Sequence, residues 1–290
     1  MIFVILLILA IIAALLNFKL IVQIISMQEG IIAMTDSIKT DIDELQLFFG
    51  EPFIIKSEYG NDIPIYQPTI GDILRSGEKN VYSIVNTLVA NTTMYRVQLW
   101  DMGIDWNKFE DFQLFCMLLP SLFQDTTKLL FGDLDFQLFN LYKTDEDGDP
   151  SFFLYNKEQN VEITKATYYQ ISAYIKRMFN IYPKVEKARG RSTKEWIIFE
   201  DRQKIELRKN EPYKSTLLPL ISSCVNHPGF KYKKSELREV GIVEFMDSVQ
   251  RLQVYESSTA LLKGAYSGFV DTSKINKDDF NFMRELSQQN

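Results

Sequence analysis

Cys224 and His227 form the arrangement in this sequence that most resembles a nucleophile with its base. The two residues lie three positions apart, and His227 is the single histidine of the 290-residue chain. Such a pair works only when the two side chains are within hydrogen-bond reach. Pro228 and Gly229 follow directly and are typical of a turn, which favours a loop or helix-end position for His227. We therefore predict no catalytic residue at this pair.

Three acidic residues could in principle bind a cation. Asp145, Asp147 and Asp149 alternate like the first ligands of a calcium loop. An EF-hand loop needs glycine at its sixth position and glutamate at its twelfth, where this chain has Pro150 and Asn156. A single histidine also excludes a multi-histidine metal site. We expect a solvated turn here and predict no metal and no cofactor.

The densest basic cluster raises the question of an anionic partner. Nucleic acid or a lipid headgroup could bind such a cluster. The net charge of −6 and the lack of aromatic residues between the basic ones favour a solvated loop instead, so we predict no nucleic-acid partner. The cluster consists of Lys184, Lys187, Arg189, Arg191 and Lys194.

Aromatic residues beside turns are the candidate protein contacts. Trp100 and Trp106 flank a turn-like stretch between two apolar segments, and Tyr266 and Phe269 follow Gly264. Large aromatic side chains often anchor protein–protein contacts. Packing in the core is the alternative explanation for all four residues.

These residues must be positioned by local elements, and the first of these is a hairpin. The segments 52–56 (PFIIK) and 63–67 (IPIYQ) flank Gly60, which begins a turn-like Gly-Asn-Asp sequence. Thr69 with Asp72 predicts the start of a helix, and Asn80 is expected to cap the next one.

Further along, the pattern predicts a sheet and then mainly helices. The short aromatic-rich segments 135–142, 151–156 and 160–163 predict a three-stranded meander. The fold class is therefore α+β, predominantly helical, with a short N-terminal β-hairpin and a central three-stranded β-meander. Helical spacing of apolar residues predicts helices over 94–102, 109–123 (interrupted near Pro120), 164–180, 192–210, 213–225, 235–255, 259–264 and 277–287.

The first sixteen residues are uninterruptedly apolar, unlike the rest of the chain. As a helix they would extend about 24 Å, which is short of the roughly 30 Å hydrocarbon core of a bilayer. No basic residue precedes them, which argues against a cleaved signal peptide. The codons of Gln28, Glu29 and Gly30 can contain a ribosome-binding purine run just before Met34. We expect 1–33 to be an over-extended start, with an N-terminal membrane anchor as the alternative.

The remainder is large enough for a substantial core. Apolar residues are 46% and aromatic residues 13% of the chain, which argues against disorder. We divide it into a mixed α+β region at 34–182, a basic loop or linker at 183–191, and a helical region at 192–290.

Several stretches resemble uncharacterised proteins encoded in the tail-morphogenesis regions of phages and prophages of Gram-positive bacteria. The likeness spans roughly 36–286 and omits the apolar leader. It is carried by PTIGDILRSGEKNVYSIV, LWDMGIDWNKFEDFQLFCMLL, TKEWIIFEDRQKIEL, FMDSVQRLQ and LLKGAYSGFVDTSKINKDDFNFMREL.

The resemblance implies a non-enzymatic tail assembly chaperone that binds tape-measure or tail-tube subunits in the host cytoplasm. One alternative is a minor structural component of the virion tail or neck. Another is a protein anchored in the inner membrane, whose membrane contact requires a genuine leader. A hydrolase that uses only carboxylates leaves no motif that residue spacing reveals, and this alternative stays open.

Overall fold

The computed structural model describes residues 42–57, 59–146, 149–268 and 271–286, and the leader and the Met34 start lie outside this range. The described chain has the predicted α+β class and is mostly helical. Among the described residues, no helix has the length and apolar character needed to cross a bilayer.

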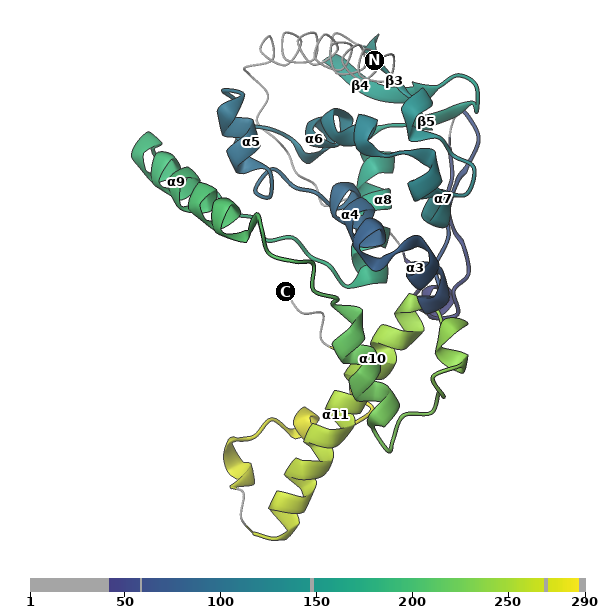
Figure 1. Cartoon of the computed structure of the whole chain (residues 1–290), viewed down its shortest axis with the longest axis vertical. Helices are drawn as coiled ribbons and strands as arrows, with labels where there is room; N and C mark the ends of the chain where they lie inside the picture. Colours follow the sequence, from purple (N-terminus) through teal and green to yellow (C-terminus); the bar gives the residue numbers. More distant parts are fainter. Residues whose placement is uncertain (1–41, 58, 147–148, 269–270, 287–290) are drawn as a thin grey trace.

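The elements follow one another along the chain as shown in Figure 1. The α-helices are α2 (Glu44–Phe48), α3 (Ile70–Ser76), α4 (Glu78–Leu88), α5 (Arg96–Asp101), α6 (Asp111–Leu118), α7 (Gln124–Phe131), α8 (Lys165–Phe179), α9 (Arg191–Arg208), α10 (Leu217–Asn226) and α11 (Ile242–Tyr266). The strands are β1 (Phe53–Ile55), β2 (Ile63–Ile65), β3 (Asn140–Glu146), β4 (Asp149–Asn156) and β5 (Val161–Ile163). Short 3-10 helices are η1 (Leu119–Ser121), η2 (Phe136–Leu138), η3 (Glu236–Arg238), η4 (Thr272–Lys274) and η5 (Lys277–Phe280).

The predicted N-terminal hairpin is confirmed. Strands β1 and β2 are antiparallel, and Ile55 lies opposite Ile63. Ile55, Ile63 and Ile65 are all buried, so the alternation of side chains in a strand places one face of the hairpin in the core. Lys56 forms an ion pair with Asp62 across the turn at 2.6 Å.

The predicted meander is also present, with a later start. The strand order is β3-β4-β5, and both pairings are antiparallel. The sequence predicted strand from Asp135, but 136–138 form a 3-10 turn because the Asp135 carboxylate accepts the Gln137 N–H (2.9 Å). The fully buried Phe136 ring then fills the core, and the strand begins at Asn140.

Helix α8 lies at the centre of the molecule, among α4, α6 and α7 (Figure 1). It begins where predicted, because the Thr164 hydroxyl accepts the Thr167 N–H (3.2 Å). Its buried residues Tyr168, Ile171 and Ile175 recur at helical spacing and form one apolar face. The Tyr168 ring stacks on Phe115 with centroids 4.6 Å apart, which joins α8 to α6.

The starts of α3 and α4 test the two helix caps that the sequence predicted. The Thr69 cap is confirmed. Its hydroxyl accepts the Asp72 N–H (3.1 Å), and the Asp72 carboxylate accepts the Thr69 N–H (2.9 Å). The Asn80 cap is wrong. Helix α4 begins at Glu78, after Gly77 with φ of +81°, and Asn80 lies inside its first turn.

A helix predicted from Tyr213 begins later, at Leu217. The Glu78 carboxylate accepts hydrogen bonds from the Thr216 N–H (2.7 Å) and the Leu217 N–H (2.9 Å). A residue of α4 therefore caps the N-terminus of α10, and this distant contact fixes where α10 starts.

The predicted helices over 235–255 and 259–264 are replaced by η3 and one continuous helix, α11. Ile70 N–H donates to the Val240 carbonyl (2.9 Å), and Ile242 N–H donates to the Pro68 carbonyl (3.0 Å). This pairing interrupts the helical path at Gly241, so α11 begins only at Ile242. No break occurs at 256–258, so 259–264 belong to the same helix.

The C-terminal segment folds back against α11. The predicted helix over 277–287 is only η5 within the described residues, and Ser287 lies outside them. Ser258 of α11 donates its hydroxyl to the Asp279 carbonyl (2.8 Å), and Arg251 donates to the Arg284 carbonyl (2.7 Å). These bonds hold the segment after η4 beside the helix.

Candidate protein-binding site at the α5–α9 seam

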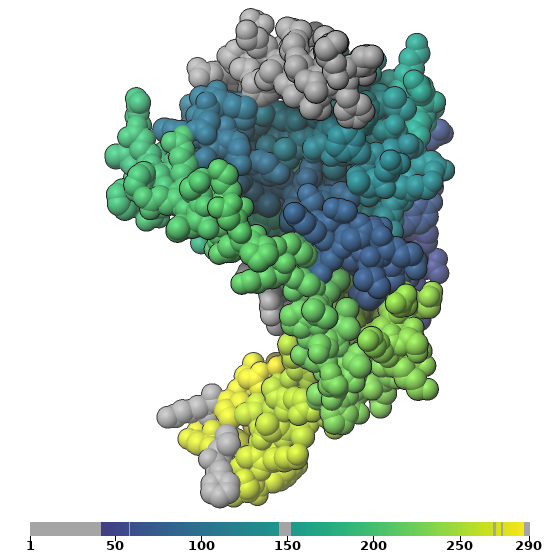
Figure 2. Space-filling view, viewed as in Figure 1, coloured from purple at the N-terminus to yellow at the C-terminus, as the bar shows by residue number. Residues whose placement is uncertain are grey.

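Helix α9 lies at the surface beside α5, in green at the upper left of Figure 2. Only Ile198 of its side chains is fully buried. Ile198 belongs to a second core cluster that includes Leu99 and Trp106 and is distinct from the main core around α8. The partly buried Ile197 also packs against this cluster. Two isoleucines are a small apolar anchor for a helix of this length, so polar contacts must supply much of the docking.

Arg96 supplies two of these contacts. Its Nε donates to Asp201 of α9 (2.5 Å) and its Nη1 donates to Glu186 of the preceding segment (2.7 Å). The Arg96 side chain is only 11% exposed. The hydrogen bond from Arg96 lowers the pKa of Asp201. Hydrogen bonds from Lys184 and then from Arg96 lower the pKa of Glu186 to about 2, so both carboxylates are ionised at neutral pH.

The segment before α9 is fixed to the body by side-chain hydrogen bonds. Asn91 donates to the Lys184 carbonyl (3.1 Å), and the Glu186 N–H donates to the Thr93 hydroxyl (3.0 Å). Asn107 donates to the carbonyl of the buried Ala188 (2.6 Å). The segment 183–188 is therefore bonded to residues that precede α5 in the sequence and to one that follows it.

The start of α9 is held by Lys194. Its Nζ forms an ion pair with Asp105 (2.6 Å) and lies 5.6 Å from the centre of the Trp106 ring. Further along the helix, Arg202 pairs with Asp101 of α5. Lys194, Ile198 and Asp201 are spaced by four and three residues, so they define the face of α9 that contacts the body.

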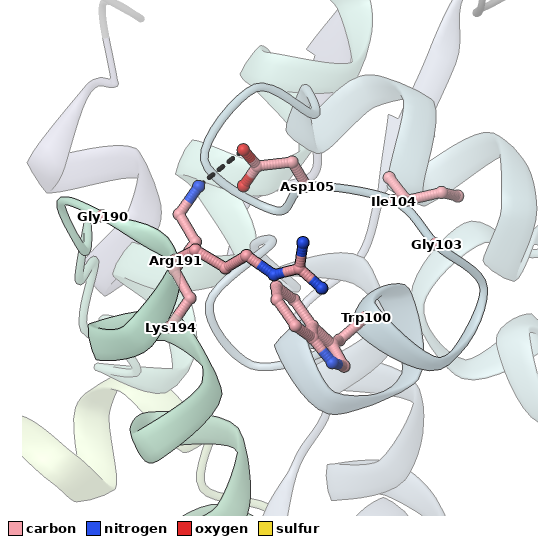
Figure 3. Close-up of a pocket in the computed structure, with 7 residues that line it drawn as sticks. All are labelled: Trp100, Gly103, Ile104, Asp105, Gly190, Arg191 and Lys194. Carbon is pink, nitrogen blue, oxygen red and sulfur yellow. Dashed lines mark hydrogen bonds and ion pairs between the residues drawn. The ribbon is translucent and has the colours of Figure 1, made fainter.

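A pocket of about 460 Å³ lies where the end of α5 meets the start of α9 (Figure 3). Figure 3 shows the Arg191 side chain reaching toward the Trp100 ring, and the Lys194–Asp105 pair on the other side of the opening. The pocket is lined by Trp100, Gly103, Ile104, Asp105, Gly190, Arg191 and Lys194.

The opposite face of α9 is exposed and carries three large apolar side chains, with the polar Glu200 and Gln203 between them. Trp196, Phe199 and Leu207 follow one another by three and eight residues, which places them on one side of a helix. Their exposed fractions are 62%, 52% and 79%. The rings of Trp196 and Phe199 lie against each other with centroids 6.0 Å apart. This outer face of α9, defined by Trp196, Phe199 and Leu207, presents two aromatic rings and an aliphatic side chain to solvent.

The structure separates the four predicted contact residues. Trp106 is 2% exposed and packs in the second core cluster, where its ring contacts Trp100 at 5.9 Å. Trp100 is half-buried and forms one wall of the pocket. Tyr266 is 87% exposed and is the last residue of α11. Phe269 lies outside the described residues.

His227 and Cys224 are not arranged as nucleophile and base. His227 is the C-cap residue of α10, which confirms the predicted helix-end position. Its Nδ1 accepts the Gly229 N–H (3.0 Å) and its Nε2 faces the Glu256 carboxylate (3.2 Å). Cys224 is buried, and burial raises the pKa of its thiol.

The basic cluster is divided among different partners. Lys184 pairs with Glu186, Arg191 with Glu195 (2.9 Å) and Lys194 with Asp105. Lys187 and Arg189 are exposed in the segment before α9.

The predicted acidic turn lies partly outside the described residues. Asp145 lies in β3 just before its last residue, Asp149 is the first residue of β4, and Asp147 is not described. Elsewhere in the described chain, no three His, Cys, Asp or Glu residues come together as metal ligands.

No protein-family model, curated protein or solved structure matches this chain. The outer face of α9 was missed in the sequence, although its spacing was visible. From the sequence alone, the buried face of an amphipathic helix would be an equally good interpretation of Trp196, Phe199 and Leu207. The structure distinguishes the two faces, because Ile198 lies in the core and these three side chains are exposed.

Proposed function

We propose that this protein acts in phage tail morphogenesis by binding other polypeptides, as an assembly chaperone for tape-measure or tail-tube subunits. The observation that supports a binding role is the outer face of α9, with its exposed Trp196, Phe199 and Leu207 side chains. The phage context comes from the sequence resemblance described above.

The outer face of α9 suits recognition of an apolar segment. Tryptophan is among the residues that contribute most to binding when a partner covers them, and a helix face is a common recognition element. Arg96, Lys194 and Arg202 hold α9 against α5 through ion pairs. Because the helix is fixed before the partner arrives, little conformational entropy is lost on binding.

A chaperone with such a surface would cover apolar segments of a tail subunit until polymerisation. Burial of an exposed apolar surface favours association at about 25 cal/mol per Å² of area removed from water. The costs of association consume part of this gain. The contact can thus be strong enough to prevent aggregation and still be displaced by the growing tail.

Affinity capture from phage-infected cells tests the proposal. We expect the chain beginning at Met34 to recover a tape-measure or tail-tube protein. A variant carrying Trp196→Gln, Phe199→Gln and Leu207→Gln should lose it, since glutamine keeps the helix and removes the apolar surface. The matched control carries Leu45→Gln and Leu74→Gln, two exposed apolar residues on α2 and α3, and should retain the partner.

Purified phage particles distinguish a chaperone from a structural component. An assembly chaperone should be absent from mature particles, and its presence there in stoichiometric amount would establish the minor tail component instead. Recovery of no tail protein by the unmodified chain, or equal recovery by the α9 variant, would overturn a binding role for this surface.

A further inference from the structure

The pocket between α5 and α9 is open because two of its walls carry no side chain. Gly103 and Gly190 have φ angles of +75° and +81°, and an added Cβ at either position would meet no atom within 4 Å. The volume of about 460 Å³ is within the usual range of ligand pockets, about 300–1,000 Å³.

The remaining walls combine an aromatic surface with two cationic side chains, which differ in how free they are to bind a ligand. Trp100 and Ile104 supply apolar surface. Lys194 is 15% exposed and already paired with Asp105, so its charge is largely compensated. Arg191 is 87% exposed and donates only its Nε to Glu195 among the described residues, while its guanidinium reaches toward Trp100 (Figure 3).

We propose that this pocket binds a carboxylate-bearing segment of the partner polypeptide, with an acidic side chain on Arg191 and a neighbouring aromatic side chain against Trp100. The terminal nitrogens of a guanidinium match the two oxygens of a carboxylate, and hydrogen bonds of this kind are among the strongest in proteins. The inference rests on the proposed function, because the ligand is part of a bound polypeptide.

The charges of the pocket favour a carboxylate over a phosphate group. Asp105 and Glu195 lie beside the two cations and offset their charge. A phosphate with nearly two negative charges would be repelled by these carboxylates, whereas a single carboxylate needs only Arg191. The apolar wall formed by Trp100 and Ile104 offers no contact that inorganic phosphate could use, whereas an aromatic ring of a bound peptide would pack against it.

Calorimetric titration with a defined peptide tests this inference. The probe is acetyl-Asp-Phe-Asp-amide, compared with acetyl-Asn-Phe-Asn-amide and with inorganic phosphate. We expect saturable binding of the acidic peptide and about tenfold weaker binding of the neutral one. Arg191→Gln should weaken binding of the acidic peptide about tenfold. Arg189→Gln removes an equal charge from an exposed residue outside the pocket and should leave the affinity unchanged.

Three results of the titrations would overturn the inference. These are no saturable binding of the acidic peptide, equal weakening by Arg191→Gln and Arg189→Gln, and phosphate binding as tight as peptide binding. The two proposals can fail separately. If the peptide binds but no tail protein is captured from infected cells, the proposed function fails and the pocket inference stands. If a tail protein is captured equally by the unmodified chain and by Arg191→Gln, the pocket inference fails alone.

Discussion

Cys116 lies on α6 in an apolar environment, and Cys224 is buried near the end of α10. Burial raises the pKa of the Cys116 thiol to about 12 and also raises that of Cys224. Since the thiolate is the reactive form, both cysteines should be inert toward thiol reagents in the native protein.

We predict that Cys116 reacts roughly a thousandfold more slowly than an ordinary thiol at pH 8, because its pKa is raised from 9.0 to about 12. The measurement is the reaction with a chromogenic disulfide, made on a Cys224→Ser variant so that one thiol reports. Unfolding in guanidinium should restore the normal rate. Fast modification of the folded variant would contradict this expectation.

Gly71 is a second single-residue constraint. A Cβ at Gly71 would lie 2.5 Å from the Arg238 carbonyl oxygen, which belongs to the backbone of η3 and cannot rotate away. At Gly241 the clash is with the Gln67 side-chain oxygen, which can move. The two glycines therefore differ in how well they should tolerate alanine.

We expect Gly71→Ala to reduce the free energy of unfolding by about 1–3 kcal/mol, as overpacking of a tight contact does. Gly241→Ala should have the smaller effect, although its contact is nominally shorter. Urea denaturation of both variants provides the comparison. Equal stability of Gly71→Ala and the unmodified protein would show that α3 and η3 are not in close contact.

At the level of secondary-structure elements, α9 depends on ion pairs to an unusual extent. Its contact with the body contains Ile197 and Ile198 and the pairs made by Arg96, Lys194 and Arg202. These pairs differ in burial, because the Arg96 side chain is mostly covered and the Arg202–Asp101 pair is about half exposed on both sides. The two pairs should therefore contribute differently to the free energy of unfolding.

We predict that Arg96→Met lowers the free energy of unfolding by about 1.5–3 kcal/mol, because it removes the guanidinium that donates to the mostly buried Asp201 carboxylate. Arg202→Met is the matched control on the same seam and should lower it by less than about 1 kcal/mol, as exposed pairs do. Denaturation monitored by tryptophan fluorescence reports both effects. A larger loss for Arg202→Met would reverse this ranking.

The ion pairs of Arg96 with Asp201 and Glu186 should weaken in acid. Asp201 and Glu186 have lowered pKa values in the folded protein, so their contribution to stability is complete above their ordinary pKa values of 3.8 and 4.5. It is lost as the pH falls toward the native pKa of Glu186, about 2. We expect the urea midpoint to fall over this range, and to fall less in Arg96→Met. Identical pH profiles for the two proteins would argue against the pairs.

Across the whole molecule, contacts join segments that lie far apart in the chain. Thr69 forms a bridge with Gly241, and Arg177 of α8 pairs with Glu44 of α2 (2.5 Å). The division at 183–191 stays a prediction. The contacts of this segment with Asn91, Thr93 and Asn107 give a physical reason to test it.

We predict that residues 34–290 unfold in one cooperative transition. Far-ultraviolet circular dichroism and tryptophan fluorescence should give coincident urea curves, and a 34–190 fragment should lack a cooperative transition of its own because it lacks Val240 and Ile242. Two separated transitions, or a stably folded fragment, would establish independent domains.

Local signals explain which parts of the fold the sequence could predict. The hairpin and α8 follow from residues within a few positions of one another, such as Thr164 with Thr167. The start of α10 depends on Glu78, which is 138 residues before Thr216. Helix α7 was not predicted, because its first turn is polar and only Thr127, Leu130 and Phe131 are buried.

The candidate site was predictable only in pieces. Trp100 was singled out as an aromatic residue beside a turn, and Arg191 and Lys194 as part of a basic cluster. Their convergence depends on how α9 docks on α5, which rests on Arg96 and Ile198. Neither residue carries a sequence signal that identifies its partner.

The backbone pairing around Thr69 and Gly241 also has a consequence during protein synthesis. Ribosomes that add about 5–20 residues per second need roughly 10–30 s to make the intervening 170 or so residues. During that interval α3 lacks η3 and the segment around Gly241, which contact it in the folded protein. A nascent chain in which α3 is incompletely covered for this long would be a client for molecular chaperones.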